Sequence, residues 1–130
     1  MTSISDTRVV ERWLSLVNRL AVLTETEVTA WKPTSDDDVF HLRVGPNTVA
    51  FTAHSAGRNN AVYEISILNF DGEVVDVFSD ADIDPTSLAG PKKKLRDMHV
   101  RIARHLNGAD EILTQILDKL PPDPDDDIPF

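Results

Sequence analysis

The chain of 130 residues contains no cysteine, which excludes disulfide bonds, thiolate metal ligands and cysteine nucleophiles. Such a composition suits a reducing compartment. The N-terminus has no basic start followed by an apolar run, so a secretory signal peptide is not expected. No apolar stretch approaches the ~20 residues that a membrane-spanning helix needs. We therefore expect a cytoplasmic protein that does not enter the membrane.

Sequence motifs of the common enzyme classes are missing as well. The chain has no GxSxG, Walker loop, HExxH or GxGxxG motif. Asp80, Asp82 and Asp84 resemble the start of a calcium-binding loop, but Pro85 and Pro91 stand where that loop needs glycine and glutamate. We therefore expect a protein that is not an enzyme and that binds no metal or cofactor.

Charge is distributed unevenly along the chain. The formal net charge is −9, which disfavours nonspecific binding of DNA by the molecule as a whole. Residues 90–105, however, hold six Lys and Arg residues against the single acid Asp97. This segment is a candidate surface for the phosphates of a nucleic acid; the alternatives are a solvated helix face that balances an acidic sheet and a dock for the acidic tail. The six cations are Lys92, Lys93, Lys94, Arg96, Arg101 and Arg104.

The hydrophobic pattern predicts a single α+β domain over residues 1–120. Apolar residues at helical spacing indicate a helix over 7–23, capped by Ser5 or Asp6. Alternating residues then indicate strands near 25–31, 38–44, 48–54, 61–70 and 73–79, which form an antiparallel meander. A last helical segment starts at Pro91, breaks at Asn107-Gly108 and stops at Pro121-Pro122, giving one broken helix or two short ones. The segment SAGRNN is too short to hold the helix that an OB-fold carries between its third and fourth strands.

Two hairpins can be predicted in detail. Asp71-Gly72 is typical of a type I′ turn, which would place Ile65 opposite Phe78 and Leu68 opposite Val75. The resulting hairpin is apolar on both faces and could be a dimer interface. The other hairpin is predicted to turn at Pro46-Asn47. Its apolar face would carry Phe40, Leu42, Val44, Val49, Phe51 and Ala53, and its reverse face His41, Arg43, Thr52 and His54.

The polar face of this sheet is a second candidate surface for nucleic acid. His41, Arg43 and His54 would lie beside Arg58 in the following loop. A groove for single-stranded DNA combines such donors with exposed aromatic rings that stack on bases. Aromatic residues make up only 6% of the chain, and Trp31 and Tyr63 are the candidates for this role.

The acidic tail, residues 121–130, has a composition that prevents regular packing. Four prolines remove backbone donors and four aspartates repel one another, so we expect a flexible segment. At its end, the Phe130 ring and the α-carboxylate belong to the same residue. That pair suits an apolar pocket with a basic rim, where the carboxylate gains charge-assisted hydrogen bonds.

The last six residues, DDDIPF, resemble the acidic tip of bacterial single-stranded DNA-binding proteins. In that family the tip binds a shared pocket on helicases, exonucleases, recombination mediators and a clamp-loader subunit. The resemblance implies that Phe130 is the anchor, Ile128 and Pro129 are apolar contacts, and Asp125, Asp126 and Asp127 form an electrostatic arm. Residues 1–120 do not resemble the DNA-binding domain of that family, and the long linker that precedes its tip is missing.

The sequence thus supports three hypotheses. The first is a bacterial or phage-borne protein of DNA metabolism, which binds single-stranded DNA without an OB-fold and recruits replication or repair proteins through its tip. The second is an adaptor or decoy that binds no DNA and occupies the pockets of such partners. The third is a dimeric, chaperone-like interaction protein with an incidental acidic end.

Overall fold

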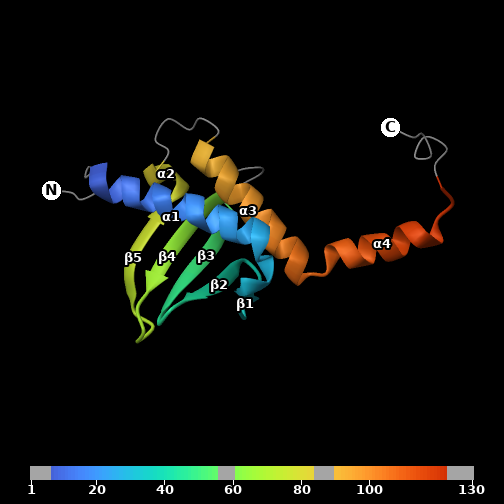
Figure 1. The fold of residues 1–130 in the computed structure, drawn as a ribbon, viewed down its shortest axis with the longest axis horizontal. Helices are drawn as coiled ribbons and strands as arrows, with labels where there is room; N and C mark the ends of the chain where they lie inside the picture. Colours follow the sequence, from blue (N-terminus) through green and yellow to red (C-terminus); the bar gives the residue numbers. More distant parts are fainter. Residues whose placement is uncertain (1–6, 56–60, 84–89, 123–130) are drawn as a thin grey trace.

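A computed structural model describes residues 7–55, 61–83 and 90–122, and these form two layers with a protruding helix (Figure 1). One layer is an antiparallel sheet in the order β1-β2-β3-β4-β5, and α1 and α3 cross one face of it. The predicted α+β fold with a five-stranded meander is confirmed. The elements are α1 (Thr7–Thr26), η2 (Val28–Ala30), β1 (Trp31–Pro33), β2 (Val39–Val44), β3 (Asn47–Ser55), β4 (Ala61–Leu68), β5 (Val74–Ser79), α2 (Asp80–Ile83), α3 (Gly90–Leu106) and α4 (Ala109–Lys119).

The first helix is longer than predicted, and the strand expected over 25–31 is wrong except for its last residue. The hydroxyl groups of Thr24 and Thr26 donate to the carbonyls four residues earlier, at 2.7 and 3.0 Å, so these β-branched residues remain helical. A 3₁₀ turn then leads to the short β1. Trp31 fixes this corner, because its indole N–H donates to Thr24 Oγ1 at 3.0 Å.

The hairpin of β2 and β3 turns at Gly45-Pro46 instead of Pro46-Asn47, because Val44 pairs with Asn47. Gly45 has φ of +60°, as the first central residue of a type II′ turn requires. The pairing is therefore shifted by two residues from the prediction. A shift of two preserves the pleat, so the predicted division of side chains between the two faces is correct even though the turn is not.

The hairpin of β4 and β5 has the predicted pairs at its base and a different turn. Ile65 pairs with Phe78 as expected, but Leu68 pairs with Val74 because the ladder shifts at Ile67 and Leu68. The Oδ1 atom of Asn69 accepts hydrogen bonds from the backbone N–H groups of residues 71 and 73, both at 3.0 Å. This side-chain-stabilised turn replaces the predicted two-residue turn, and Gly72 occupies its positive-φ position at +83°.

The core lies between the sheet and the helices α1 and α3. Its fully buried side chains come from both layers, and they include Phe51, Ile65, Phe78, Leu95 and Ile102. Trp13 of α1 stacks on Phe78 at a ring distance of 4.9 Å, and its N–H donates to Asp76 at 2.9 Å. The helical layer is thus attached to the sheet by aromatic packing and by polar contacts of indole N–H groups, Trp13 to Asp76 and Trp31 to Thr24.

The C-terminal half contains one helix that the sequence did not predict and one break that it did. The short α2 follows β5 directly, where we expected only a connector. Pro91 lies in the first turn of α3, close to its predicted place. Gly108, with φ of +65°, separates α3 from α4, so the predicted break is confirmed. The proposed cap residues of α1, the connector around Asp84-Pro85 and the tip lie outside the described residues.

Candidate functional site

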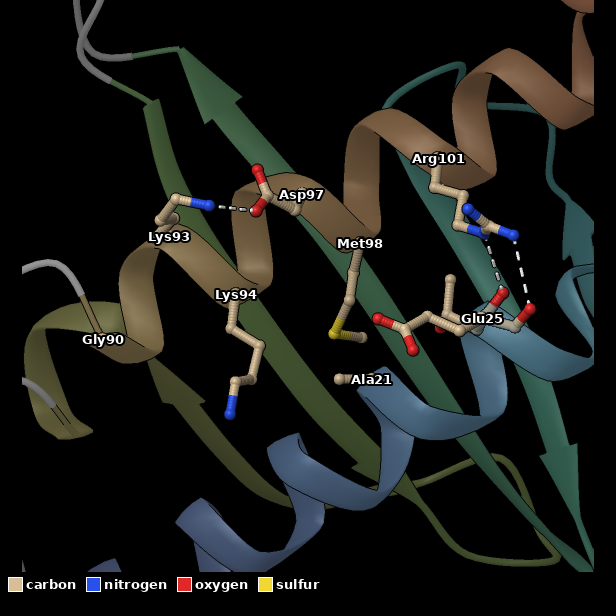
Figure 2. Close-up of a pocket in the computed structure, with 9 residues that line it drawn as sticks. Ala21, Glu25, Gly90, Lys93, Lys94, Asp97, Met98 and Arg101 are labelled. Carbon is tan, nitrogen blue, oxygen red and sulfur yellow. Dashed lines mark hydrogen bonds and ion pairs between the residues drawn. The ribbon is translucent and has the colours of Figure 1, made fainter. Parts of the chain in front are cut away.

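The basic residues of α3 border a groove of about 560 Å³ between α1 and α3 (Figure 2). Its floor includes Met98 of α3 and Ala21 of α1, and Lys93, Lys94 and Arg101 lie along its rim. Glu25 and Asp97 also line it, so the groove is cationic but not free of acids. An apolar floor with a basic rim suits an anionic group that carries some apolar surface.

Each cation of this segment has a partner within the described residues. Lys93 donates to Asp97 at 2.8 Å, one helical turn away, and this bond holds the pKa of the Asp97 carboxyl below its usual value. Lys94 donates to Asn18 of α1 at 2.7 Å. The remaining partners are Asp80 for Lys92 at 3.5 Å, Asp97 for Arg96 at 3.9 Å and Asp110 for Arg104. Exposed pairs of this kind are weak in water, so an external anion can compete for the lysines.

Arg101 has a structural role that the sequence did not suggest. Its guanidinium donates to the backbone carbonyls of Thr24 at 3.1 Å and Glu25 at 3.3 Å. These carbonyls belong to the last turn of α1, where they have no partner inside the helix. Arg101 therefore caps α1 and holds it against α3, and its charge is less available to a ligand than that of Lys93.

Trp31 and Tyr63 are buried, which corrects the expectation that they stack on bases. The exposed fraction of Trp31 is 0% and that of Tyr63 is 7%. Both rings pack in the core against Phe51. Burial also raises the pKa of the Tyr63 hydroxyl. A stacking platform for single-stranded nucleic acid cannot use either ring.

The polar face of the sheet lies on the opposite side of the molecule from α3. Phe40 and Leu42 point into the core beneath the helices, so His41 and Arg43, which alternate with them, point away. The same alternation places Thr52 and His54 on the outer face. The residues predicted to bind nucleic acid therefore form two separate groups, and Arg58 lies outside the described residues.

Individual contacts on this outer face are few. His54 lies 3.5 Å from Glu64 of the neighbouring strand, and Arg43 donates to the carbonyl of Gly45 at 3.2 Å. The face also carries the exposed side chains of Val75 and Val77 on β5. It is thus mixed in charge and partly apolar, which favours a protein partner over the phosphate backbone of a nucleic acid.

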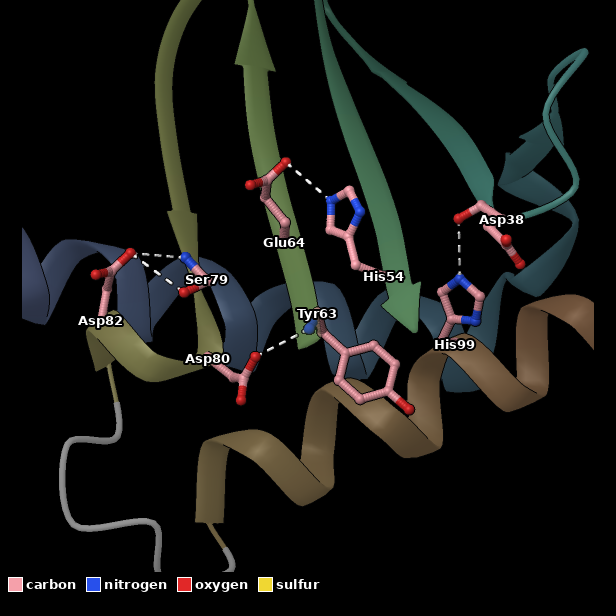
Figure 3. A network of polar contacts seen from close by, with 8 residues as sticks. All are labelled: Asp38, His54, Tyr63, Glu64, Ser79, Asp80, Asp82 and His99. Carbon is pink, nitrogen blue, oxygen red and sulfur yellow. Dashed lines mark hydrogen bonds and ion pairs between the residues drawn. The ribbon is translucent and has the colours of Figure 1, made fainter. Parts of the chain in front are cut away.

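On the side of α3 that faces the sheet, the partly buried His99 borders the core (Figure 3). His99 packs against Phe40, Phe51 and Tyr63 with ring distances of 4.6, 5.1 and 5.8 Å. Its Nε2–H donates to the carbonyl of Asp38 at 3.3 Å. Burial lowers the pKa of His99 below its ordinary value, more than the hydrogen bond to Asp38 raises it. The lowered pKa of this partly buried histidine favours its neutral form at physiological pH.

Asp80 is a buried carboxylate at the start of α2. Its Oδ1 accepts the backbone N–H of Tyr63 at 2.9 Å (Figure 3). Its Oδ2 lies 3.5 Å from Lys92 Nζ. Its neighbour Asp82 accepts the backbone N–H of Ser79 at 2.9 Å. These aspartates tie β4, β5 and α2 together. In the part of the chain that the structure describes, no three His, Asp or Glu side chains gather as metal ligands.

A wide, exposed apolar stripe lies on α4, a segment that the sequence predicts only as the second part of a broken helix. No residue of α4 is buried. The sequence contains the stripe but not its exposure, because exposure depends on the direction that the chain takes after Gly108. The apolar residues with their exposed fractions are Ile112 (51%), Leu113 (47%), Ile116 (51%), Leu117 (59%) and, one residue past the helix, Leu120 (57%).

Comparison with protein-family models, with curated proteins and with solved structures finds no match to this chain. Among the described helices, none is both long enough and apolar enough to cross a membrane.

Proposed function

We propose that this protein is a non-enzymatic adaptor of bacterial or phage DNA metabolism, which acts in the cytoplasm and presents its acidic tip, residues 125–130, to replication and repair proteins. The partners would be the helicases, exonucleases, recombination mediators and clamp-loader subunit that bind the tip of single-stranded DNA-binding proteins. The folded unit would serve as the support that carries the tip.

The observation that supports this proposal is the course of the chain after α3. The helix α4 leaves the two-layer body and buries none of its residues (Figure 1). Pro121 and Pro122 at its far end are exposed. The tip therefore begins only three residues beyond a point that already lies away from the body. A partner with a deep pocket can approach that point without colliding with the sheet.

The chemistry of the tip gives the expected mode of binding. The ring of Phe130 would fill an apolar pocket, which contributes about 2–3 kcal/mol. Asp125, Asp126 and Asp127 would face a basic rim, which increases the association rate and makes binding sensitive to salt. The structure of these residues is not described, so this mode rests on their sequence.

The experiment is a capture assay with three purified baits: wild type, Phe130→Ala and the matched control Phe70→Ala. Phe70 has an exposed fraction of 75%, so its removal deletes an equally large ring elsewhere on the molecule. Wild type and Phe70→Ala should capture replication and repair proteins from a bacterial lysate, and a free DDDIPF peptide should elute them. Phe130→Ala should capture none of them. Recovery of the same proteins by Phe130→Ala would contradict the proposal.

Binding of single-stranded DNA is the second candidate function, and the cationic groove favours it. Lys93 and Arg96 are exposed, and among the described residues both pair with Asp97, so phosphates can displace that acid. The buried positions of Trp31 and Tyr63 count against base stacking, so binding would be weak and strongly dependent on salt.

The test for this second function is the anisotropy of a labelled oligo-dT at low and moderate salt. The double variant Lys93→Gln/Arg96→Gln should weaken binding and reduce its salt dependence. The matched control Arg12→Gln/Arg19→Gln removes two exposed cations from α1 and should bind like wild type. If wild type does not bind at low salt, single-stranded DNA is not a ligand and the adaptor function remains.

A further inference from the structure

The apolar stripe of α4 differs from the stripes of the other long helices. Those of α1 and α3 contain buried residues, such as Val17 and Leu20 in α1 and Leu95 and Ile102 in α3, whereas α4 buries none. The five apolar residues, Ile112, Leu113, Ile116, Leu117 and Leu120, recur at i, i+1, i+4, i+5 and i+8. That spacing places them on one wide face of a helix. The composition of this face is typical of a buried helix face, but no part of the described chain packs on it.

Helix stability leads to the same conclusion. A helix of 11 residues is shorter than the ~12–15 residues below which isolated helices are marginal in water. Most helical stability in proteins comes from packing an amphipathic face. Within the chain, α4 has Arg104 paired with Asp110 at its first turn and an N–H bond from Ile112 to the Gly108 carbonyl at 3.1 Å. These contacts hold only its start, so the rest of the helix needs a partner.

We propose that α4 is a dimerisation helix, which pairs antiparallel with α4 of a second copy of this chain. A twofold axis near Ile116 would bring each stripe onto the other, so that Leu113 of one copy faces Leu120 of the second. One self-complementary surface then covers both stripes, as an isologous interface requires. No other partner has to be assumed for the face to be buried.

The charges of the helix favour the antiparallel arrangement. Its first turn carries Asp110 and Glu111 and no cation, whereas its last turn carries both Asp118 and Lys119 and is close to neutral. Antiparallel pairing places the acidic end of each helix beside the end of the other that holds the lysine, and it opposes the two helix dipoles favourably. It also keeps the bodies at opposite ends of a helix about 16 Å long, which separates two acidic domains. Parallel pairing would bring both acidic ends, and both bodies, together.

The area of the stripe agrees with a weak dimer. Five apolar side chains about half exposed present roughly 500 Å² per copy, which is at the upper end of patches found on monomers. Two copies bury roughly 1,000 Å², the lower limit for a specific interface, so we expect a dissociation constant in the micromolar range. The inference of a dimer depends on the properties of α4 alone. The inference that a dimer presents two acidic tips to partners also depends on the proposed function.

The test is the mass of the full chain measured by light scattering and sedimentation between about 1 and 200 µM, a range that brackets the expected dissociation constant. Wild type should change from monomer to dimer across this range. Ile116→Asp should remain monomeric, because it places a charge at the centre of the stripe. The matched control Gln115→Asp changes the neighbouring residue, which lies off the stripe, and should dimerise like wild type. A monomeric wild type at the highest concentration, or a dimeric Ile116→Asp, would overturn the proposal.

The absence of cysteine makes the orientation testable with single introduced thiols. A mixture of Leu113→Cys and Leu120→Cys chains should oxidise mainly to the mixed disulfide. Disulfides between identical variants would contradict the antiparallel pairing. Neither residue is buried in one chain, so the variants should fold, and circular dichroism checks this.

Failure of the dimer and failure of the tip give different results. Phe130→Ala should dimerise normally and lose its captured partners. Ile116→Asp should keep the same affinity for a single tip-binding partner in solution but bind less tightly to a surface coated with that partner, because it presents one tip instead of two. If the surface experiment shows no difference, the dimer does not present two tips together.

Discussion

At the scale of single residues, polar side chains of this protein connect parts of the chain that lie apart in the sequence. Asp80 accepts the N–H of Tyr63, Arg101 donates to the last carbonyls of α1, and Trp31 donates to Thr24. Sequence analysis identified these as polar or aromatic residues and assigned two of them to a nucleic-acid surface. Their roles could not be predicted, because each depends on a neighbour 7 to 77 positions away in the chain.

Asp80→Ala should destabilise the fold strongly. The substitution leaves the buried N–H of Tyr63 without an acceptor and Lys92 without its acid, so we expect a loss of about 2–4 kcal/mol in the free energy of unfolding. Asp80→Asn keeps an oxygen for the N–H and should lose less. Urea denaturation followed by circular dichroism measures both. Equal losses for the two variants would show that the hydrogen bond is not the cause.

His99 should make stability dependent on pH. Burial lowers its pKa in the folded state from the ordinary 6.5, so the unfolded chain takes up the proton first as the pH falls. Its contribution is complete above pH 6.5 and is lost as the pH decreases below that value. The Tm should therefore drop between pH 7.5 and 5.5, and His99→Gln should reduce the drop. An unchanged drop in His99→Gln would assign it to other groups.

At the scale of elements, the sequence predicted which face of each strand is buried better than it predicted the turns. Alternation along β2 and β3 identified Phe40, Leu42 and Phe51 as core residues. The turns were misplaced because two competing signals were close together: Gly45 took the place given to Asn47, and Asn69 stabilised a longer loop than Asp71-Gly72 suggested. Thr26, at the end of α1, falls in the predicted strand because a β-branched residue favours strand, and the sequence does not show that its hydroxyl donates to the carbonyl four residues earlier.

Removal of α4 should leave the folded body intact. The helix buries no residue, so a chain truncated after Asn107 should keep its free energy of unfolding within about 1 kcal/mol of wild type at concentrations where both are monomeric. Leu95→Ala in α3 is the contrast, since this fully buried side chain should cost about 2–5 kcal/mol. Chemical denaturation at 1 µM compares them. A large loss on truncation would mean that α4 packs on its own domain.

At the scale of the whole molecule, the sheet has one covered face and one open face, and its two edges are β1 and β5. The sequence could predict the α+β class and the meander, because both follow from local periodicity. It could not predict that α3 and the polar residues His41 and Arg43 lie on opposite sides, because that separation is a property of the packed layers. The basic residues of α3 and the polar face of the sheet therefore cannot form one continuous nucleic-acid surface.

Hydrogen exchange should follow the order of the strands. Amides of β3 and β4 are paired on both sides in the middle of the sheet, so they should exchange slowest and report global unfolding. Amides of β5 on its open edge should exchange faster than those of β4. Exchange measured by mass spectrometry on peptides from each strand tests this. Equal protection of β5 and β4 would indicate that a second chain pairs with the β5 edge. The dimer interface would then include this edge, with or without the α4 stripe.

The position of the two indole rings has a practical consequence. Trp13 has an exposed fraction of 9% and Trp31 of 0%, and both belong to the packed layer between α1 and the sheet. Neither ring lies on α4 or in the tail. Intrinsic tryptophan emission therefore reports whether the two-layer body is folded. It should be insensitive to partners that bind α4 or the tail. A shift in that emission when a partner is added would mean that the partner has reached the core.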